Sequence, residues 1–177
     1  LDLCLAAMKA TSGSIMLLNE DGELTMAAYK NLPAKTVMGF RQILGEGIAG
    51  WVAQTGEALL LTEDDPDPRF SGVKEIKDAV CIPIRDENAV VGVLSLNERQ
   101  SGEGFTRSSL DFLGPVALQI GMALTRARLY EKIAREKEKS TAIVESMGES
   151  LCVRAPDRTI IFANSAHKAI FGENCVG

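Results

Sequence analysis

The sequence has no long apolar stretch and no excess of positive charge. Its apolar runs, such as Ala89–Leu94, fall far short of the roughly 20 residues that a transmembrane helix needs. The formal net charge is −5, so the chain has no broad positive surface for the phosphates of nucleic acids or anionic lipids. We therefore expect no nucleic-acid binding and no membrane contact by these residues.

Closely spaced cysteines and clustered metal ligands are also lacking. The four cysteines, Cys4, Cys81, Cys152 and Cys175, share no close spacing, which excludes a CxxC metal or redox motif. The single histidine, His167, has no second ligand at metal-binding spacing, so we expect it on the surface and expect no metal site. These features predict a reduced, cytoplasmic chain with buried free thiols.

Catalytic motifs are equally scarce. No GxSxG, HExxH or GKS/T element occurs, so we expect no catalytic residues and no enzymatic activity. The run Gly45–Gly50 matches the GxGxxG pattern of dinucleotide-binding folds. However, Glu46 would place a carboxylate in the phosphate loop, and a helix that ends at Gly56 is too short for a βαβ crossover. We interpret the motif as a tight turn that leads into a short helix.

The sequence does contain two pairs of apolar runs separated by polar turns. Residues 14–19 and 24–29 flank an acidic Asp21-Gly22 turn, which predicts a β-hairpin. Residues 80–84 and 90–96 are rich in β-branched side chains and predict a second hairpin. An antiparallel sheet is the architecture that these pairs favour.

Two residues of the second predicted hairpin, Cys81 and Pro83, allow more specific predictions. Cys81 lies between Val80 and Ile82, so we expect a buried thiol that packs as a small hydrophobic residue. Pro83 cannot donate a backbone hydrogen bond, which predicts a sheet edge or a bulge at that point.

Helical segments are predicted on both sides of these hairpins. Residues 1–10 have the pattern of the last turns of a helix whose start is missing, and a short helix is plausible over 33–38. From Thr106 to Lys139 the apolar residues recur at three- and four-residue spacing. At ~1.5 Å per residue this helix would be about 50 Å long, which is longer than one small domain can cover.

This succession of segments resembles the GAF domain family. The matching pieces are the glycine-rich Leu44-Gly-Glu-Gly-Ile-Ala-Gly-Trp-Val-Ala, the acidic Asp67-Pro-Arg-Phe70, the paired strands Cys81-Ile-Pro-Ile84 and Val91-Gly-Val-Leu94, and Ala127-Arg-Leu-Tyr130. The resemblance implies that residues 1–130 form a GAF domain with a truncated first helix. It also implies an α+β fold, with a central antiparallel sheet, the first and last helices on one face, and short helices and a ligand pocket on the other.

The C-terminal residues resemble the opening of a PAS domain. The matching pieces are Asp157-Arg-Thr-Ile-Ile-Phe-Ala-Asn164 and Ile170-Phe-Gly172. We therefore expect residues 131–141 to continue the exit helix as a linker and residues 142–177 to form the N-terminal part of a PAS domain. A GAF–helix–PAS series is similar to the input half of bacterial sensor histidine kinases and cyclic-di-nucleotide enzymes.

The GAF resemblance implies a small-molecule pocket. The positions that match pocket-lining ones are Ser14, Tyr29, Ile48, Ala49, Phe70, Val73, Ile76 and Ser95. Apolar walls with a few hydroxyl groups suit an oriented small ligand. In the alternative interpretation Tyr29 and Phe70 only pack the core and the pocket is closed.

The resemblance does not extend to the cyclic-nucleotide-binding members of the family. Asn97 and Phe105 match their motif, but its lysine position is Glu98 and its Asp-Glu positions are Ser109 and Leu110. The Lys–Asp ion pair of that motif cannot form here. The sequence names no cofactor and no ligand.

We therefore expect the sensory input region of a signal-transduction protein. A small molecule in the GAF pocket would bias the exit helix, which would pass the signal to the PAS domain and to an output domain such as a histidine kinase. Leu129 and Ile133 lie between charged residues and predict a homodimer through this helix. The alternative is a dimerisation and relay module that binds no ligand.

Overall fold

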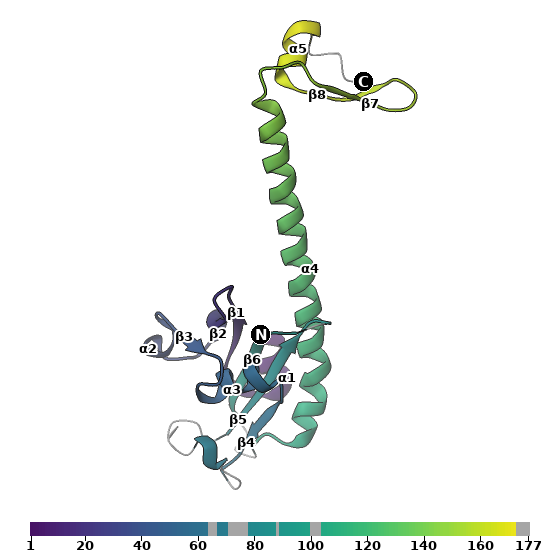
Figure 1. The fold of residues 1–177 in the computed structure, drawn as a ribbon. Helices are drawn as coiled ribbons and strands as arrows, with labels where there is room; N and C mark the ends of the chain where they lie inside the picture. Colours follow the sequence, from purple (N-terminus) through teal and green to yellow (C-terminus); the bar gives the residue numbers. More distant parts are fainter. Residues whose placement is uncertain (64–66, 71–77, 88, 100–103, 173–177) are drawn as a thin grey trace. The chain divides into compact units, whose positions relative to one another are not determined.

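The computed structural model describes residues 1–177 except 64–66, 71–77, 88, 100–103 and 173–177 (Figure 1). The chain divides into two compact units, residues 1–125 and residues 126–177. Each unit is described by itself.

The first unit is built on an antiparallel sheet. Its described strands lie in the order β3-β2-β1-β6-β5-β4. Their bounds are β1 Ala10–Leu18, β2 Glu23–Lys30, β3 Arg41–Ile43, β4 Leu59–Leu61, β5 Ala79–Arg85 and β6 Val90–Arg99. Both predicted hairpins are confirmed, as β1–β2 and β5–β6, and the two are joined through β1 and β6 at the centre of the sheet.

Helices accompany the sheet on both faces, as predicted. Their bounds are α1 Asp2–Met8, α2 Ala34–Val37, α3 Gly47–Thr55, the 3-10 turn η1 Pro68–Phe70, and α4 Arg107–Glu145, which continues into the second unit. The predicted closure of the glycine-rich helix at Gly56 is confirmed, because Gly56 caps α3 with a left-handed φ of 69°.

Two hydrophobic cores lie on opposite faces of the sheet because successive strand residues point to opposite sides. One core joins Leu94 and Leu96 of β6 to Leu5 of α1 and Leu113 of α4. The other joins Val93 of the same strand to residues of α3 and β4. The strand β6 is therefore buried on both faces and links α4 to α3 through adjacent residues.

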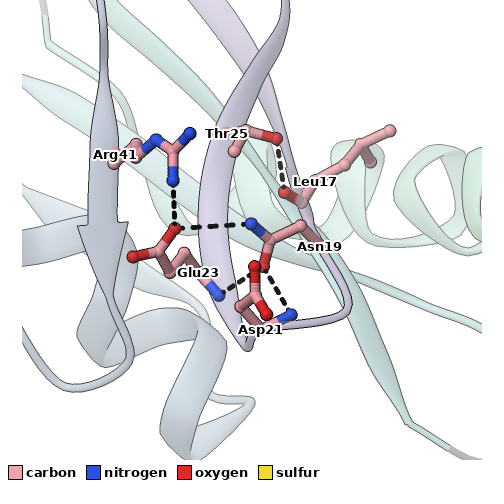
Figure 2. Close-up of polar contacts among 6 residues, drawn as sticks. All are labelled: Leu17, Asn19, Asp21, Glu23, Thr25 and Arg41. Atoms are coloured by element: carbon pink, nitrogen blue, oxygen red, sulfur yellow. Dashed lines mark hydrogen bonds and ion pairs between the residues drawn. The ribbon is translucent and has the colours of Figure 1, made fainter.

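The β1–β2 turn is held by Asn19 (Figure 2). Its side-chain oxygen accepts hydrogen bonds from the backbone N–H groups of Asp21, at 3.0 Å, and of Glu23, at 2.8 Å. An Asx turn of this kind replaces backbone bonds that the chain reversal removes. The hairpin register is set locally by this side chain and by Thr25, whose hydroxyl donates to the Leu17 carbonyl at 3.3 Å.

The edge strand β3 is a feature that the sequence did not predict. Arg41 forms an ion pair with Glu23 at 3.1 Å, which ties β3 to β2 (Figure 2). The same carboxylate oxygen of Glu23 also accepts from the Asn19 side chain at 3.4 Å. The backbone ladder between β2 and β3 holds this strand, whose only β-branched residue is Ile43, and the exposed ion pair adds little to it.

The position of Pro83 agrees with its predicted edge environment. The strand β4 pairs with β5 only as far as Leu59, which lies opposite Cys81. Beyond that point β5 has a described neighbour on one side alone, and Pro83 faces Val93 of β6. A residue without a backbone donor is tolerated there because no second ladder needs it.

The long helix α4 was predicted from Thr106 to Lys139, with the helical linker reaching residue 141, and it continues to Glu145. Leu113 and Ala117 are buried in the first unit, whereas Leu129 and Ile133 of the second are exposed. Among the described residues, no helix is long and apolar enough to cross a membrane.

In the second unit, α4 leads to a hairpin of β7 (Cys152–Arg154) and β8 (Ile160–Ala163) and then to α5 (Ser165–Phe171). Asn164 caps α5 as predicted, because its side-chain oxygen accepts from the His167 N–H at 3.0 Å. The predicted surface position of His167 was wrong. Its side chain is only 7% exposed, its Nδ1 lies 2.8 Å from the Ser150 hydroxyl, and its ring packs 4.6 Å from that of Phe171.

Candidate functional site

A cavity of about 490 Å³ lies on the α3 face of the sheet. Its lining comes from β1, β2, β3, β5, β6, α3 and the segment around α2. The lining residues are Ser12, Ser14, Met16, Met26, Asn31, Leu32, Pro33, Thr36, Phe40, Gln42, Gly47, Ile48, Ala49, Cys81, Ser95, Asn97 and Glu98.

The polar floor of the cavity is produced by strand register. Ser12 pairs with Asn97, and Ser14 pairs with Ser95, across the β1–β6 ladder. Paired residues of antiparallel strands project on the same side of a sheet. Alternate residues of β1 and β6 therefore place Ser12, Ser14, Ser95 and Asn97 on the face of the sheet that the cavity occupies.

The walls are largely apolar. Met16 of β1, Met26 of β2, Phe40 beside β3, and Ile48 and Ala49 of α3 all line the cavity. Apolar walls around a few oriented polar groups are the usual composition of a small-molecule site.

Cys81 contributes a thiol to the floor. Its Sγ lies 3.1 Å from the Ser95 hydroxyl, and the residue is 3% exposed. Burial raises the pKa of the Cys81 thiol to about 11, although the Ser95 hydrogen bond opposes the rise. The thiol therefore stays protonated near neutral pH and is a weak nucleophile.

Asn97 is the least satisfied polar residue of the site. Its Nδ2 donates to the Ser12 hydroxyl at 3.4 Å. Its Oδ1 is buried and has no hydrogen-bond partner, and it is the only such side-chain atom among the described residues. An acceptor left unpaired in this way is costly.

Charge in the site is of one sign. Glu98 is the only charged residue of the lining within the part of the chain that the structure describes. Its carboxylate accepts from the Thr11 hydroxyl at 3.5 Å, and its backbone N–H donates to the Asp78 carbonyl at 2.8 Å. Glu98 has a φ of 50°, an uncommon conformation for a residue other than glycine.

The residues predicted to line a pocket separate into three groups. Ser14, Ile48, Ala49 and Ser95 all line the cavity. Tyr29 does not, and its side chain is 54% exposed at the end of β2.

Phe70 also lies outside the cavity lining. It packs edge to face on Trp51 with 6.3 Å between ring centroids, beside the guanidinium of Arg69, which lies 4.2 Å from the Trp51 ring. This contact joins η1 to α3. The remaining two predicted positions, Val73 and Ile76, lie outside the described residues.

Sequence reasoning missed several polar residues of the lining. Gln42 of β3 donates through Nε2 to the Glu46 carbonyl at 2.7 Å, and Asn31 donates through Nδ2 to the Thr11 carbonyl at 2.8 Å. Ser12 and Asn97 were missed as a pair because they are far apart in the sequence. The alternation of Ser12 and Ser14 along one strand was the signal that could have found the polar floor.

In the part of the chain that the structure describes, no group of three or more His, Cys, Asp or Glu side chains is placed to hold a metal ion. What the geometry offers is a polar floor, apolar walls and one unpaired acceptor, an arrangement suited to reversible binding.

Comparison with known proteins gives a family match for the first unit. Residues 1–125 match the family described as "GAF domain". Among curated relatives, the probable 3',5'-cyclic phosphodiesterase pde-5 of Caenorhabditis elegans is 34% identical over 116 residues, which cover 62% of this chain and 16% of the relative. The dual 3',5'-cyclic-AMP and -GMP phosphodiesterase 11A of Takifugu rubripes is 31% identical over 59% of this chain and 12% of its own length. The chain thus matches only a small part of these enzymes.

Solved structures show the same fold. The GAF domain of an Acinetobacter phosphoenolpyruvate-protein phosphotransferase superposes with a TM-score of 0.64 at 25% identity, over 74% of this chain and 80% of that one. The GAF-B domain of DevS from Mycobacterium smegmatis superposes with a TM-score of 0.61 at 17% identity, over 75% of this chain and 92% of that one.

Proposed function

Because this chain belongs to the GAF domain family of small-molecule-binding regulatory domains, we propose that its cavity is the sensory site of a signal-transduction protein. A small molecule would bind between the sheet and α3 and change the state of α4. The chain itself would bind and relay, and the proposal assigns it no catalytic step.

The cavity is the observation that carries this proposal. Its volume of about 490 Å³ falls within the roughly 300–1,000 Å³ of small-molecule sites. Its floor combines the hydroxyl groups of Ser12, Ser14 and Ser95 with an amide whose oxygen is unpaired. The hydroxyl groups can orient a ligand, and a core that served only for packing would not leave this space.

The strand β6 offers a route from the cavity to α4. Ser95 lines the cavity, whereas its neighbours Leu94 and Leu96 share a core with Leu113 of α4. A ligand that favours one position of β6 would therefore favour one packing of α4. A coupling free energy of ~1–3 kcal/mol is enough for regulation.

The proposal also includes the domains that would receive the signal from α4. The β7–β8 hairpin and α5 follow α4 in the order that the PAS resemblance implies, and we assign residues 142–177 to the start of a PAS domain on that basis. A histidine kinase is the output that a GAF–helix–PAS series favours. The curated relatives are named as cyclic-nucleotide phosphodiesterases, but this chain matches 16% of the first and 12% of the second, so their substrates are not carried over to its cavity.

The proposed binding site can be tested by filling it. We expect native mass spectrometry of gently purified protein, or a thermal-shift screen of metabolites and nucleotides, to find a molecule that binds the wild-type chain. Ligand at 100 times its Kd stabilises a folded protein by about 2.7 kcal/mol. Ser14→Leu should abolish this stabilisation, because the leucine side chain would occupy the floor of the cavity.

Ser108→Leu is the matched control, since Ser108 is exposed at the start of α4 and is not part of the lining. It should leave the ligand-induced shift unchanged. A broad screen with no binder, or an equal shift in Ser14→Leu, would contradict a sensory cavity and favour a relay that binds no ligand.

Dimerisation through α4 is the second part of the proposal. Leu129 is 56% exposed and Ile133 is 55% exposed, and the charged side chains of Lys132, Glu136 and Lys137 lie around them. Apolar residues four apart on a helix form one stripe, which a second helix can cover. We expect Leu129→Asp with Ile133→Asp to convert a dimer into a monomer in light scattering.

A control pair on the same helix is Tyr130→Asp with Ala134→Asp. Each position lies one residue further along α4, which rotates it by about 100° away from the stripe. We expect this pair to remain dimeric. A monomeric wild-type chain, or a dimer that persists in both double variants, would contradict dimerisation through α4.

A further inference from the structure

We propose that residues 31–40 form a strap that closes over the cavity and swings open about Asn31 and Gly39. The strap connects β2 to β3 and carries α2 (Figure 1). This inference rests on the proposed binding function and adds how a ligand reaches the same site from solvent.

The strap lies between the cavity and the solvent. Its cavity-lining residues are Asn31, Leu32, Pro33, Thr36 and Phe40. Asn31, Pro33 and Thr36 are exposed as well. The floor is buried, since Ser14 is 4% and Cys81 is 3% exposed. Residues that border both a cavity and the solvent form its outer wall, so movement of the strap would open the floor to solvent.

Both ends of the strap have a left-handed backbone. The φ angle is 56° at Asn31 and 68° at Gly39, and glycine and asparagine are the residues that adopt this conformation most readily. The strand β2 ends at Lys30 and β3 begins at Arg41, and both strands are held in the sheet. Rotation at two positions therefore lets the segment between them move while the strands stay in place.

The hydrogen bonds of the strap backbone form turns inside the strap. The N–H groups of Thr36 and Met38 donate to the carbonyls of Pro33 and Ala34, each at 2.9 Å. All four residues of α2 keep some exposure, and Met38 after them is 82% exposed. A segment with little buried apolar surface can open at a low cost in free energy while the sheet stays folded.

Contacts at both ends hold the strap closed. The Asn31 Nδ2 donates to the Thr11 carbonyl at 2.8 Å. Phe40 packs against the core that α3 shares with the sheet. Loss of one of these contacts, or backbone strain at Gly39, should favour the open strap.

Cys81 supplies a reporter of strap opening. Its thiol lies in the cavity lining and is buried, so we expect iodoacetamide to alkylate it only when the strap opens. Cys4 is buried in the core on the opposite face of the sheet, so its alkylation reports unfolding of the whole unit. Cys152 is partly exposed and shows that the reagent is active. Peptide mapping by mass spectrometry would give a separate rate for each cysteine.

Gly39→Ala is expected to raise the alkylation rate of Cys81 about tenfold and to leave that of Cys4 unchanged. A Cβ at Gly39 would meet no described atom within 4 Å, so the effect comes from the left-handed φ alone. That strain is present only in the closed strap, and a tenfold change corresponds to about 1.4 kcal/mol. Gly39→Asn should have a smaller effect, because asparagine tolerates this conformation better. Asn31→Ala, which loses the bond to Thr11, should raise the rate as Gly39→Ala does.

Gly22→Ala is the matched control. Gly22 has a φ of 78°, and a Cβ there would also meet no described atom within 4 Å. It lies in the β1–β2 turn and is not one of the described lining residues. This variant carries the same kind of backbone strain and should leave the Cys81 rate at the wild-type value.

Three results would overturn the strap. They are equal Cys81 rates in Gly39→Ala and Gly22→Ala, a Cys81 rate that rises only together with that of Cys4, and a Cys81 that stays unmodified in every variant while Cys152 reacts fully. Because the experiment uses no ligand, such a result would leave the sensory cavity to be decided by the metabolite screen. A silent screen would in turn leave the measured opening of the strap unaffected.

Discussion

Gly121→Ala is expected to lower the free energy of unfolding of residues 1–125 by about 3 kcal/mol, although alanine is the better helix former. A Cβ atom at this position would lie 2.5 Å from the carbonyl carbon of Arg85 and closer still to its oxygen. Both atoms belong to the backbone at the end of β5, so rotation of a side chain cannot relieve the clash. Alanine gains only about 1 kcal/mol over glycine inside a helix, which does not offset it.

The same helix offers a control for this prediction. Gly114 also lies within α4, and a Cβ there would meet no atom within 4 Å. Crowding against Pro115 opposes the helix-forming gain of alanine, so Gly114→Ala should change the free energy of unfolding by no more than about 1 kcal/mol. Chemical denaturation followed by the fluorescence of Trp51 would measure both variants. Equal stability of Gly121→Ala and wild type would show that α4 does not approach β5 as closely as described.

Asn164→Ala is expected to unfold the hairpin and short helix of the second unit and to leave the first unit intact. Asn164 is fully buried, and its side chain makes four hydrogen bonds. Its Nδ2 donates to the carbonyls of Val144, at 3.2 Å, and Glu149, at 2.8 Å. Its Oδ1 accepts from the N–H groups of Leu151, at 2.9 Å, and His167, at 3.0 Å. One side chain therefore joins the end of α4, the start of β7 and the first turn of α5.

Removal of this side chain leaves four backbone groups without their partner. At about 1 kcal/mol or more for each, the loss amounts to roughly 4 kcal/mol, and a two-stranded hairpin has little stability of its own. Hydrogen exchange followed by mass spectrometry should show fast exchange over residues 150–172 and unchanged protection over 10–18 and 90–98. Ser165→Ala, which removes an exposed hydroxyl that donates to Glu145, is the control and should change exchange little. Protection that survives in Asn164→Ala would contradict this role.

Local signals in the sequence were sufficient for most of the elements. Both hairpins could be predicted because the residues that form a turn act within a few positions of it. The turns were indicated by Asp21-Gly22 in the first hairpin and by the polar residues 85–88 in the second. Gly56 predicted the end of α3 because a left-handed cap favours glycine. Cys81 was predicted to be buried, and it is, since its apolar neighbours made a buried strand clear.

Features that depend on residues far away in the sequence could not be predicted from local signals. The edge strand β3 is held by its backbone pairing with β2, and its own three residues carry almost no strand signal. His167 is buried and contacts Ser150 and Phe171. The sequence around a single histidine does not indicate contacts of this kind.

The candidate site was predicted in part for the same reason. Ser14 and Ser95 were placed by resemblance, and they lie opposite each other in the structure. Asn97 was noted only as a motif position, because its unpaired oxygen depends on which atoms of Ser12 face it across the sheet. Tyr29 matched a pocket position by resemblance, yet it is exposed at the end of β2.

The order of the strands has a consequence for how the first unit forms. Both hairpins close over short loops and can form within microseconds. The central pairing of β1 with β6, in contrast, joins residues as far apart in the sequence as Ala10 and Arg99. Closing so long a loop is entropically unfavourable until many contacts form together. During synthesis β1 must therefore wait until β6 has left the ribosome, and the cavity floor that these two strands share is completed in that late step.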